Sequence, residues 1–186
     1  YSFAVGYLNK DKKNDLVITS TTTGDIYVIN GSAIPTTSAS IPLVSLLDGV
    51  KGANFITPHN SSSINRVTIL DVNRDGFKDI VSANITNLKV YGILGRLNIF
   101  PTTPVVNLND TFFNGVNGFT LSTSIAVNAS TVSSIGDVNN DNFEDFALRG
   151  EQYPSRYDVV VVFGKAIWPA NEDVSAMLNG IKASTI

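Results

Sequence analysis

Short apolar runs separated by polar, turn-forming stretches follow one another along the whole chain. Three of these runs share one form, rich in Val, Ile and aromatic residues and closed by Gly: 25–31, 89–95 and 158–164. β-Branched and aromatic residues favour extended backbone, whereas Gly, Asn, Asp and Ser favour the turns between strands. The pattern therefore predicts many short strands. The longest unbroken apolar run, Val159 to Phe163, is far shorter than the ~20 residues that a membrane-spanning helix needs.

This pattern repeats three times. Asp11, Asp75 and Asp141 occupy equivalent places in three similar loops, and they lie 64 and 66 residues apart. Each unit has a strand that enters the loop, a strand that leaves it, the Gly-terminated strand and a last strand. The entering strands are expected at 2–7, 66–70 and 131–136, the leaving strands at 16–20, 80–83 and 146–149, and the last strands at 53–57, 118–122 and 180–184.

Four short antiparallel strands per unit are typical of a β-propeller blade. We predict an all-β fold of three four-stranded antiparallel β-propeller-type blades, divided at 1–59, 60–124 and 125–186, which form a partial or assembling propeller. A single β-sandwich with coincidental Asp turns is the alternative. The nearly equal spacing of three loops, with matching Gly and Pro residues downstream of each, disfavours the sandwich.

The second loop carries oxygen donors at the spacing of a calcium loop. Asp71, Asn73, Asp75 and Asp79 hold positions 1, 3, 5 and 9, and the carbonyl of Phe77 holds position 7. Alternate side chains of a tight loop point toward one centre, and Ca²⁺ prefers six to eight oxygen ligands at about 2.3–2.6 Å. The spacing therefore predicts a Ca²⁺ site in this loop.

The third loop repeats the donor set. Its members are Asp137, Asn139, Asp141, the carbonyl of Phe143 and Asp145. Neither loop is an EF-hand, because position 12 is not acidic and the flanking runs are typical of strands. Eight of the thirteen Asp residues of the chain lie in the three equivalent loops, and such packing of like charge is unfavourable unless a cation neutralises it.

The first loop has a weaker donor set. Tyr7 replaces the acidic residue at position 1, which leaves Asn9, Asp11, the carbonyl of Lys13 and Asp15 as donors. Two carboxylates stand where the other loops have three, and Lys12 and Lys13 add positive charge. We expect weak calcium binding here or none, with the lysine side chains partly replacing the ion.

Composition narrows the functional classes. The formal net charge is −3, so a strongly basic face for nucleic acid is not expected. The absence of Cys excludes thiol nucleophiles and Cys-ligated metals, and the single His, His59, excludes sites that need two imidazoles. The sequence contains no catalytic motif of the common hydrolase, metalloprotease, nucleotide or dinucleotide types. A non-enzymatic role is therefore predicted.

The third unit resembles the FG-GAP repeat of integrin α-subunit β-propellers. The residues that carry the resemblance are the loop 136–145 and the later Val-Val-Phe163-Gly164-Lys. The resemblance extends over the whole chain and implies a calcium loop between the first two strands of each blade, an extracellular location, and a role in adhesion or recognition. The chain departs from the repeat where Asn30-Gly31 and Leu94-Gly95 replace Phe-Gly, and it has three blades where the family usually has seven.

Five Asn-x-Ser/Thr sequons accompany this resemblance, at Asn30, Asn60, Asn84, Asn109 and Asn128. All five fall in expected loops or at strand ends, where a glycan has room. Asn60 and Asn128 occupy equivalent loops between units and are the preferred sites. Trp168, which precedes Pro169, is expected to be a packing anchor between blades rather than a sugar-stacking platform.

Four functions remain open. The leading one is a calcium-stabilised, non-enzymatic extracellular module for adhesion or protein assembly. The others are a subunit of an extracellular filament of stacked blades, a lectin-like glycan-binding propeller, and an accessory propeller of a secreted enzyme. The apolar end strands that contain Phe3, Val5 and 159–163 predict contacts with other copies of the chain or with adjoining blades. A nucleic-acid partner and insertion into a membrane are not expected, and an extracellular protein or glycan ligand remains open.

Overall fold

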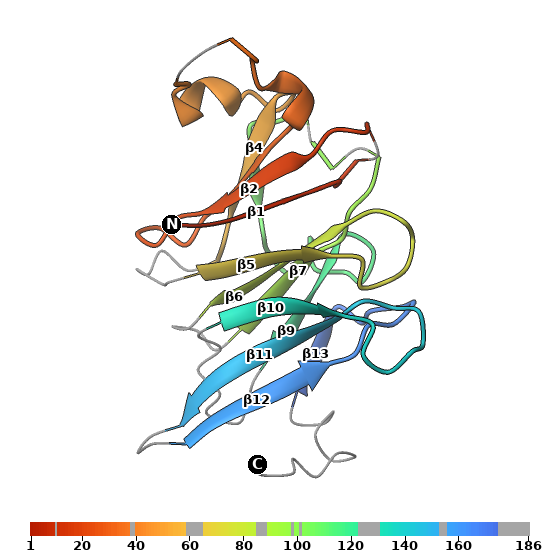
Figure 1. The fold of residues 1–186 in the computed structure, drawn as a ribbon. Helices are drawn as coiled ribbons and strands as arrows, with labels where there is room; N and C mark the ends of the chain where they lie inside the picture. The colour runs from red at the N-terminus through yellow and green to blue at the C-terminus, as the bar shows by residue number, and fades with distance from the viewer. Residues whose placement is uncertain are drawn as a thin grey trace.

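The described part of the chain folds into three β-sheets of five, five and three strands, stacked one on another (Figure 1). The computed structural model describes residues 1–174 except 10, 38–39, 59–64, 85–88, 98, 101, 123–130 and 153–155. The predicted all-β class is confirmed. Among the described residues, the helical elements are two short 3₁₀ helices, η1 (Gly31–Ala33) and η2 (Leu43–Leu46). None of the described helices is long and apolar enough to cross a membrane.

The first sheet contains four consecutive antiparallel strands and a fifth strand from further along the chain. The antiparallel strands are β1 (Ser2–Gly6), β2 (Asp15–Thr19), β3 (Ile26–Ile29) and β4 (Gly52–Ile56). The fifth, β8 (Val105–Asn107), pairs with β4 in parallel. Alternate residues of β2 are fully buried, as expected for a strand whose two faces meet different surroundings.

The second sheet repeats this arrangement. Its antiparallel strands are β5 (Asn65–Leu70), β6 (Asp79–Asn84), β7 (Lys89–Ile93) and β9 (Gly118–Ser122). Strand β13 (Asn171–Asp173) pairs with β9 in parallel. Every residue of β6 is buried, because this sheet lies between the other two.

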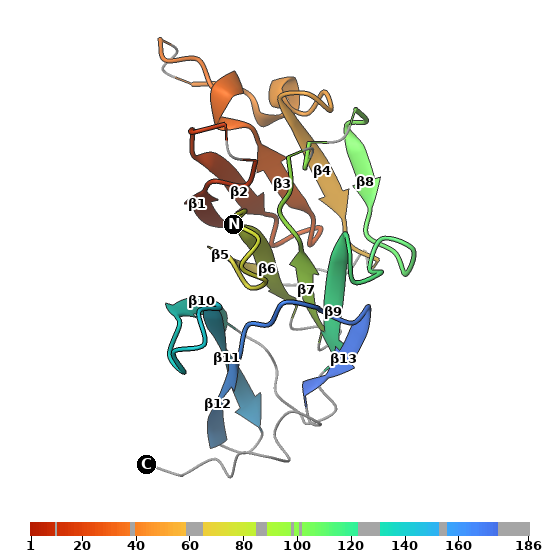
Figure 2. The same ribbon diagram turned by 90° about the vertical axis from the view of Figure 1, so that its right-hand side faces the viewer.

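The third sheet consists of β10 (Thr131–Gly136), β11 (Asp145–Gln152) and β12 (Arg156–Val162), all antiparallel. Its expected last strand, 180–184, lies outside the described residues. The first strands of the three sheets, β1, β5 and β10, lie along one side of the stack, and β8 and β13 lie on the opposite side (Figure 2).

The prediction of purely antiparallel four-stranded units is wrong in one respect. In two sheets a short strand from the following unit is added in parallel to the outer edge, so the sheet orientation is mixed. The sequence of β13, Asn-Glu-Asp, contains no strand-favouring residue, and that of β8, Val-Val-Asn, is too short to show alternation. They pair because an exposed edge offers unpaired backbone groups. Among the described strands the three sheets form an open stack and not a closed ring.

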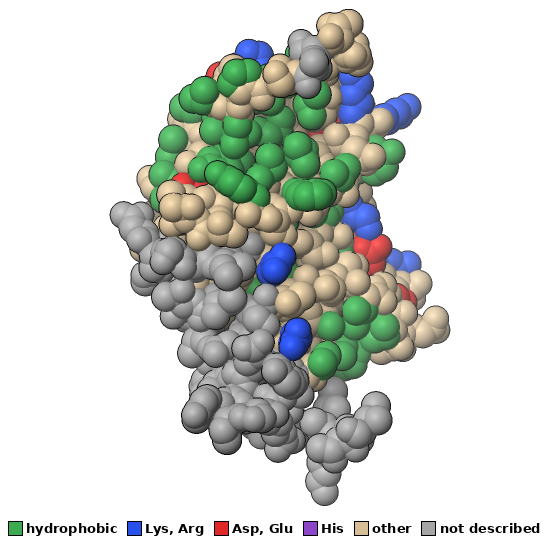
Figure 3. Space-filling view, turned by 60° about the vertical axis from the view of Figure 1, so that its left-hand side comes forward, with side chains coloured by type: hydrophobic (Ala, Val, Ile, Leu, Met, Phe, Trp, Pro, Cys, Tyr) green, Lys and Arg blue, Asp and Glu red, His purple; other side chains and the backbone are tan. Residues whose placement is uncertain are grey.

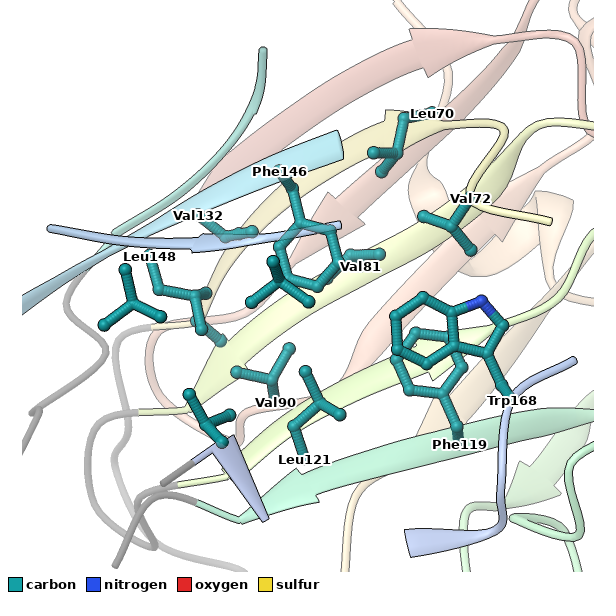
Figure 4. Packing of buried hydrophobic residues seen from close by; sticks show 14 of the residues in the cluster. Leu70, Val72, Val81, Val90, Phe119, Leu121, Val132, Phe146, Leu148 and Trp168 are labelled. Atoms are coloured by element: carbon teal, nitrogen blue, oxygen red, sulfur yellow. The ribbon is translucent and has the colours of Figure 1, made fainter. Parts of the chain in front are cut away.

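Two apolar cores lie between the sheets. The core between the first and second sheets includes Val17, Phe55 and Tyr91, and the core between the second and third includes Val81, Phe119 and Phe146. Trp168 is 2% exposed, and its ring stacks on Phe119 with 4.0 Å between ring centroids (Figure 4). The prediction that Trp168 anchors one unit on the next is confirmed.

Candidate metal centres

The acidic residue at position 9 of each loop is fully buried. Asp15, Asp79 and Asp145 stand at the start of the second strand of each sheet and are 0% exposed. In each case one carboxylate oxygen accepts the backbone N–H of loop position 2. The distances are 3.0 Å for Leu8 to Asp15, 2.8 Å for Val72 to Asp79 and 2.9 Å for Val138 to Asp145.

The other oxygen of the same carboxylate holds the end of the third strand. It accepts the backbone N–H of the glycine that closes each apolar run, at 3.0 Å from Gly31, 2.7 Å from Gly95 and 2.8 Å from Gly164. One buried carboxylate therefore ties the loop to the end of the third strand of the same sheet. Ionic acceptors make stronger hydrogen bonds than neutral ones, so this tie strengthens when the carboxylate is charged.

These glycines are required by space. A Cβ atom on Gly31, Gly95 or Gly164 would lie 2.0, 2.2 or 2.6 Å from the carbonyl oxygen of the residue at loop position 8. Real Cβ atoms do not approach backbone oxygens so closely. The glycine at the end of each apolar run is thus needed because it packs directly against the backbone of the Asp-rich loop.

The second loop is a series of turns closed by its own side chains. The two oxygens of Asp71 accept N–H groups of Asp75 and Gly76 at 3.2 and 3.0 Å, and Asn73 Oδ1 accepts the N–H of Asp75 at 3.2 Å. Asp75 Oδ1 accepts the N–H of Phe77 at 2.8 Å. Arg74 and Gly76 adopt left-handed backbone, with φ of 57° and 81°.

The third loop has the same internal bonds and the same backbone shape. Asp137 accepts N–H groups of Asp141 and Asn142 at 3.1 and 2.8 Å, and Asp141 accepts that of Phe143 at 2.9 Å. Asn140 and Asn142 have φ of 61° and 72°. Asn tolerates this region better than most residues, which explains how the loop keeps its shape without a glycine at position 6.

The first loop differs at its open end. Asp11 accepts the N–H of Lys13 at 2.9 Å and the hydroxyl of Ser32 at 2.7 Å. Lys12 has φ of 67°, a strained value for a long side chain. Tyr7 supplies no carboxylate at position 1, and Lys12 and Lys13 are exposed. The expected replacement of the ion by lysine side chains stays a prediction.

Burial and like charge raise the pKa of the loop carboxylates. Burial, aided by the charges of Asp75 and Asp71, raises the pKa of Asp79 to about 8, although the hydrogen bonds from Gly95 and Val72 oppose the shift. Burial also raises the pKa of Asp71, with a further contribution from Asp75. The pKa of Asp15 is raised by burial as well. A cation in the second loop would relieve this electrostatic cost.

The donor chemistry of the second and third loops fits a hard cation, since every candidate ligand is an oxygen. Among the residues that the structure describes, however, no group of three or more His, Cys, Asp or Glu side chains is positioned to hold a metal ion. The reason lies in the hydrogen bonds above, because the oxygens of Asp71, Asp75 and Asp79 are directed at backbone N–H groups. The calcium assignment stays a prediction at all three loops.

The loops also join neighbouring sheets. The residue at loop position 8 donates its N–H to the carbonyl of position 1 in the preceding loop, at 3.0 Å for Lys78 to Tyr7 and 3.2 Å for Glu144 to Asp71. Lys78 Nζ also lies 2.6 Å from Glu144 Oε1. The sequence does not predict these bonds, because the spacing within one loop carries no information on the loop beside it.

The five sequons meet different surroundings. Asn84 is fully buried at the end of β6, so the prediction of a glycan there is wrong for the folded protein. Asn109 is exposed, and Asn30 is half-buried with its Oδ1 accepting the N–H of Ser32 at 2.8 Å. Asn60 and Asn128, like His59, lie outside the described residues.

The hollows lined by described residues include two at the first sheet. One, of about 290 Å³, lies on the first sheet between Leu16, Ile18, Ile29, Ile34 and Leu46, among other residues. The other, of about 260 Å³, lies at the junction of the first two sheets and contains one charged side chain, Arg96. Neither lining includes an acidic or histidine side chain among the described residues, so neither offers an acid–base pair.

No protein-family model matches the chain, and no curated protein sequence matches it significantly.

Proposed function

We propose that the chain is a non-enzymatic, calcium-stabilised module of three blades of the FG-GAP or integrin α-subunit type, which acts in extracellular adhesion or protein assembly. One observation carries the proposal: the same loop recurs in each sheet, tied by a buried carboxylate to the glycine that ends the third strand. This arrangement accounts for both halves of the repeat, the Asp-rich loop and the Gly-terminated strand.

The residues that would hold Ca²⁺ are those of the second and third loops. They are Asp71, Asn73, Asp75, the Phe77 carbonyl and Asp79, and Asp137, Asn139, Asp141, the Phe143 carbonyl and Asp145. Asp75 and Asp141 are exposed, so their side chains can exchange backbone N–H partners for the ion without disturbing a core. The bound ion would supply positive charge where burial and like charge now make the ionised carboxylates unfavourable.

The roles of the chain's own residues follow from this. Asp79 and Asp145 would hold the loop against the sheet, and the exposed acids would close over the ion. The adhesion or assembly role is supported by the stack itself, because its end sheets present apolar side chains such as Phe3 and Val159 to solvent.

Calorimetric titration of the chelator-treated protein with Ca²⁺ tests the proposal. We expect two sites, and a rise in unfolding free energy of about 2.7 kcal/mol per site at 100-fold excess over Kd. Asp75→Asn combined with Asp141→Asn should abolish both effects. Asp110→Asn, an exposed acid outside the loops, is the matched control and should retain them. No heat of binding and an unchanged thermal midpoint would disprove the calcium assignment.

A further inference from the structure

The two end sheets of the stack expose side chains whose equivalents in the other sheets are buried. Strand pairing defines the equivalence: Phe3, Val67 and Val132 lie opposite residues 18, 82 and 148 of their neighbouring strands. Phe3 is 74% exposed, whereas Val67 and Val132 are 8% and 4% exposed. The outward face of the first sheet is thus built like the faces that the second and third sheets bury.

This first-sheet outer face consists of Phe3, Val5, Leu16 and Ile18; Ile29 lies on the same side of the sheet but is 0% exposed. Hydrophobic side chains gather over this end of the molecule in the space-filling view (Figure 3). Val5 is 56% exposed, and its equivalent in the second sheet, Ile69, packs against the core between the first two sheets. Leu16 and Ile29 correspond to Ile80 and Ile93 of that same core.

The outer face also has a place for an incoming side chain. The hollow of about 290 Å³ is lined by Leu16, Ile18 and Ile29 together with Leu46 from η2. The equivalent residues of the second sheet, Ile80, Ile93 and Phe112, pack in one core with Phe55 from the last strand of the preceding sheet. Phe55 and Phe112 are in edge contact, with ring centroids 6.3 Å apart.

At the opposite end of the stack, the third sheet exposes the residues that in the other sheets pack against the following sheet. The third-sheet outer face consists of Val138, Val159 and Phe163, which are 55%, 65% and 37% exposed. Val138 holds loop position 2, where Leu8 and Val72 are 0% exposed, each in the core toward the following sheet. The residues equivalent to Val159 are Ile26 and Val90, both 0% exposed, and the residue equivalent to Phe163 is Leu94, 5% exposed.

The chain therefore forms the same kind of sheet–sheet interface twice. The two faces that make up such an interface are also present, exposed, on the outer sides of the first and third sheets. We propose that a second copy of this chain covers the first-sheet outer face with its own third-sheet outer face, so that copies associate head to tail. Continuity with the two internal interfaces is the argument, because each half is already seen bound to the other half inside the chain. An interface between unlike faces produces a ring if the rotation closes and a filament if it does not.

The internal interfaces also fix the register of this association. Lys78 and Glu144, at loop position 8, donate to the position-1 carbonyls of the preceding loops, Tyr7 and Asp71. The next members of the series are Asn14 of one copy and Asp137 of the other, both exposed. We expect the Asn14 N–H to donate to the Asp137 carbonyl across the new interface. The inference rests on the proposed assembly function, and it does not require calcium to be the ion in the loops.

Single-face variants test the proposal in the full chain. Phe3→Asp blocks one face and Val159→Asp the other, and Val116→Asp, at a turn residue that is 76% exposed, is the matched control. Sedimentation velocity is measured from 1 to 100 µM. The wild type and the control should grow with concentration beyond twice the monomer mass, and each face variant should remain a monomer. An equimolar mixture of the two face variants should form a dimer and stop there, since each retains one complementary face.

Other outcomes overturn the proposal. A wild type that stays monomeric at 100 µM would assign the faces to another protein or to adjoining sequence. Dimers of Val159→Asp alone would indicate pairing of like faces. Thermal midpoints confirm that the variants fold, and Ile18→Asp serves as a second block of the first-sheet outer face. Calcium titration of the monomeric variants is independent, so the failure of association and the failure of calcium binding are distinguishable.

Discussion

Trp168 gives the sharpest test of how one sheet is held on the next. The residue is 2% exposed, and it stacks on Phe119 of the second sheet at 4.0 Å and lies 6.5 Å from Phe146 of the third. Replacing a buried Trp by Ala removes its transfer free energy and leaves a cavity, which together cost about 3–5 kcal/mol. We expect Trp168→Ala to lower the free energy of unfolding by that amount.

A second substitution separates the ring from its polar group. The buried Nε1 of Trp168 has no hydrogen-bond partner among the described residues, and an unsatisfied buried donor costs about 1–3 kcal/mol. Trp168→Phe removes this donor together with part of the ring, so the two effects offset each other. The expected net change is within about 1 kcal/mol. In a double-mutant cycle with Phe119→Leu, the stacked pair should show a coupling energy of about 0.5–1.5 kcal/mol.

Urea unfolding followed by far-UV circular dichroism measures these changes, because Trp168 is the only Trp and its fluorescence is lost in the variants. Ile167→Ala, at a neighbouring residue that is 82% exposed, is the control and should change stability by less than about 0.5 kcal/mol. A loss below about 1 kcal/mol for Trp168→Ala would refute the anchoring role. An equal loss for Trp168→Phe and Trp168→Ala would refute the offset from the unpaired donor.

Three further predictions concern the loops. Burial raises the pKa of Asp79 to about 8, so in the presence of a chelator the folded state holds this proton more tightly than the unfolded state. The free energy of unfolding should therefore fall by up to about 1.4 kcal/mol per pH unit from about pH 4 to 8. In pH-dependent melts, Asp79→Asn should remove that part of the slope. Gly95→Ala would place a Cβ atom 2.2 Å from a carbonyl oxygen and should lower the free energy of unfolding, measured in urea, by about 3 kcal/mol. Gly136→Ala has open space around the new Cβ atom and is strained only by its positive φ, so it should cost about 1–2 kcal/mol. Equal costs would contradict the steric argument. The side chains of Lys78 and Glu144 are 34% and 36% exposed, so a double-mutant cycle should give a coupling energy of only about 0.2–1 kcal/mol that declines with added salt. A coupling energy that does not depend on salt would contradict this degree of exposure.

The sequence by itself determined the repeat and the strands within it. Every described strand of the predicted first, second and last kinds begins and ends within three residues of the expected range, because alternation and Gly, Asn and Asp turns are local signals. The loops were also found from the sequence, since their donors are spaced along a few residues. The apolar strands that contain Phe3 and Val159 were also recognised from the sequence, and both residues are exposed.

The tertiary structure alone decided what depends on residues distant in the chain. The parallel additions β8 and β13 pair with edges that the first and second sheets leave available, and these edges cannot be recognised from such short segments. The burial of Asn84 follows from the position of the second sheet between two others, which no sequon can indicate. The carboxylate of Asp79 turned out to hold Gly95, 16 residues away, as well as its own loop. Local patterns specify elements and turns, whereas burial and partners are set by what the folded chain brings alongside them.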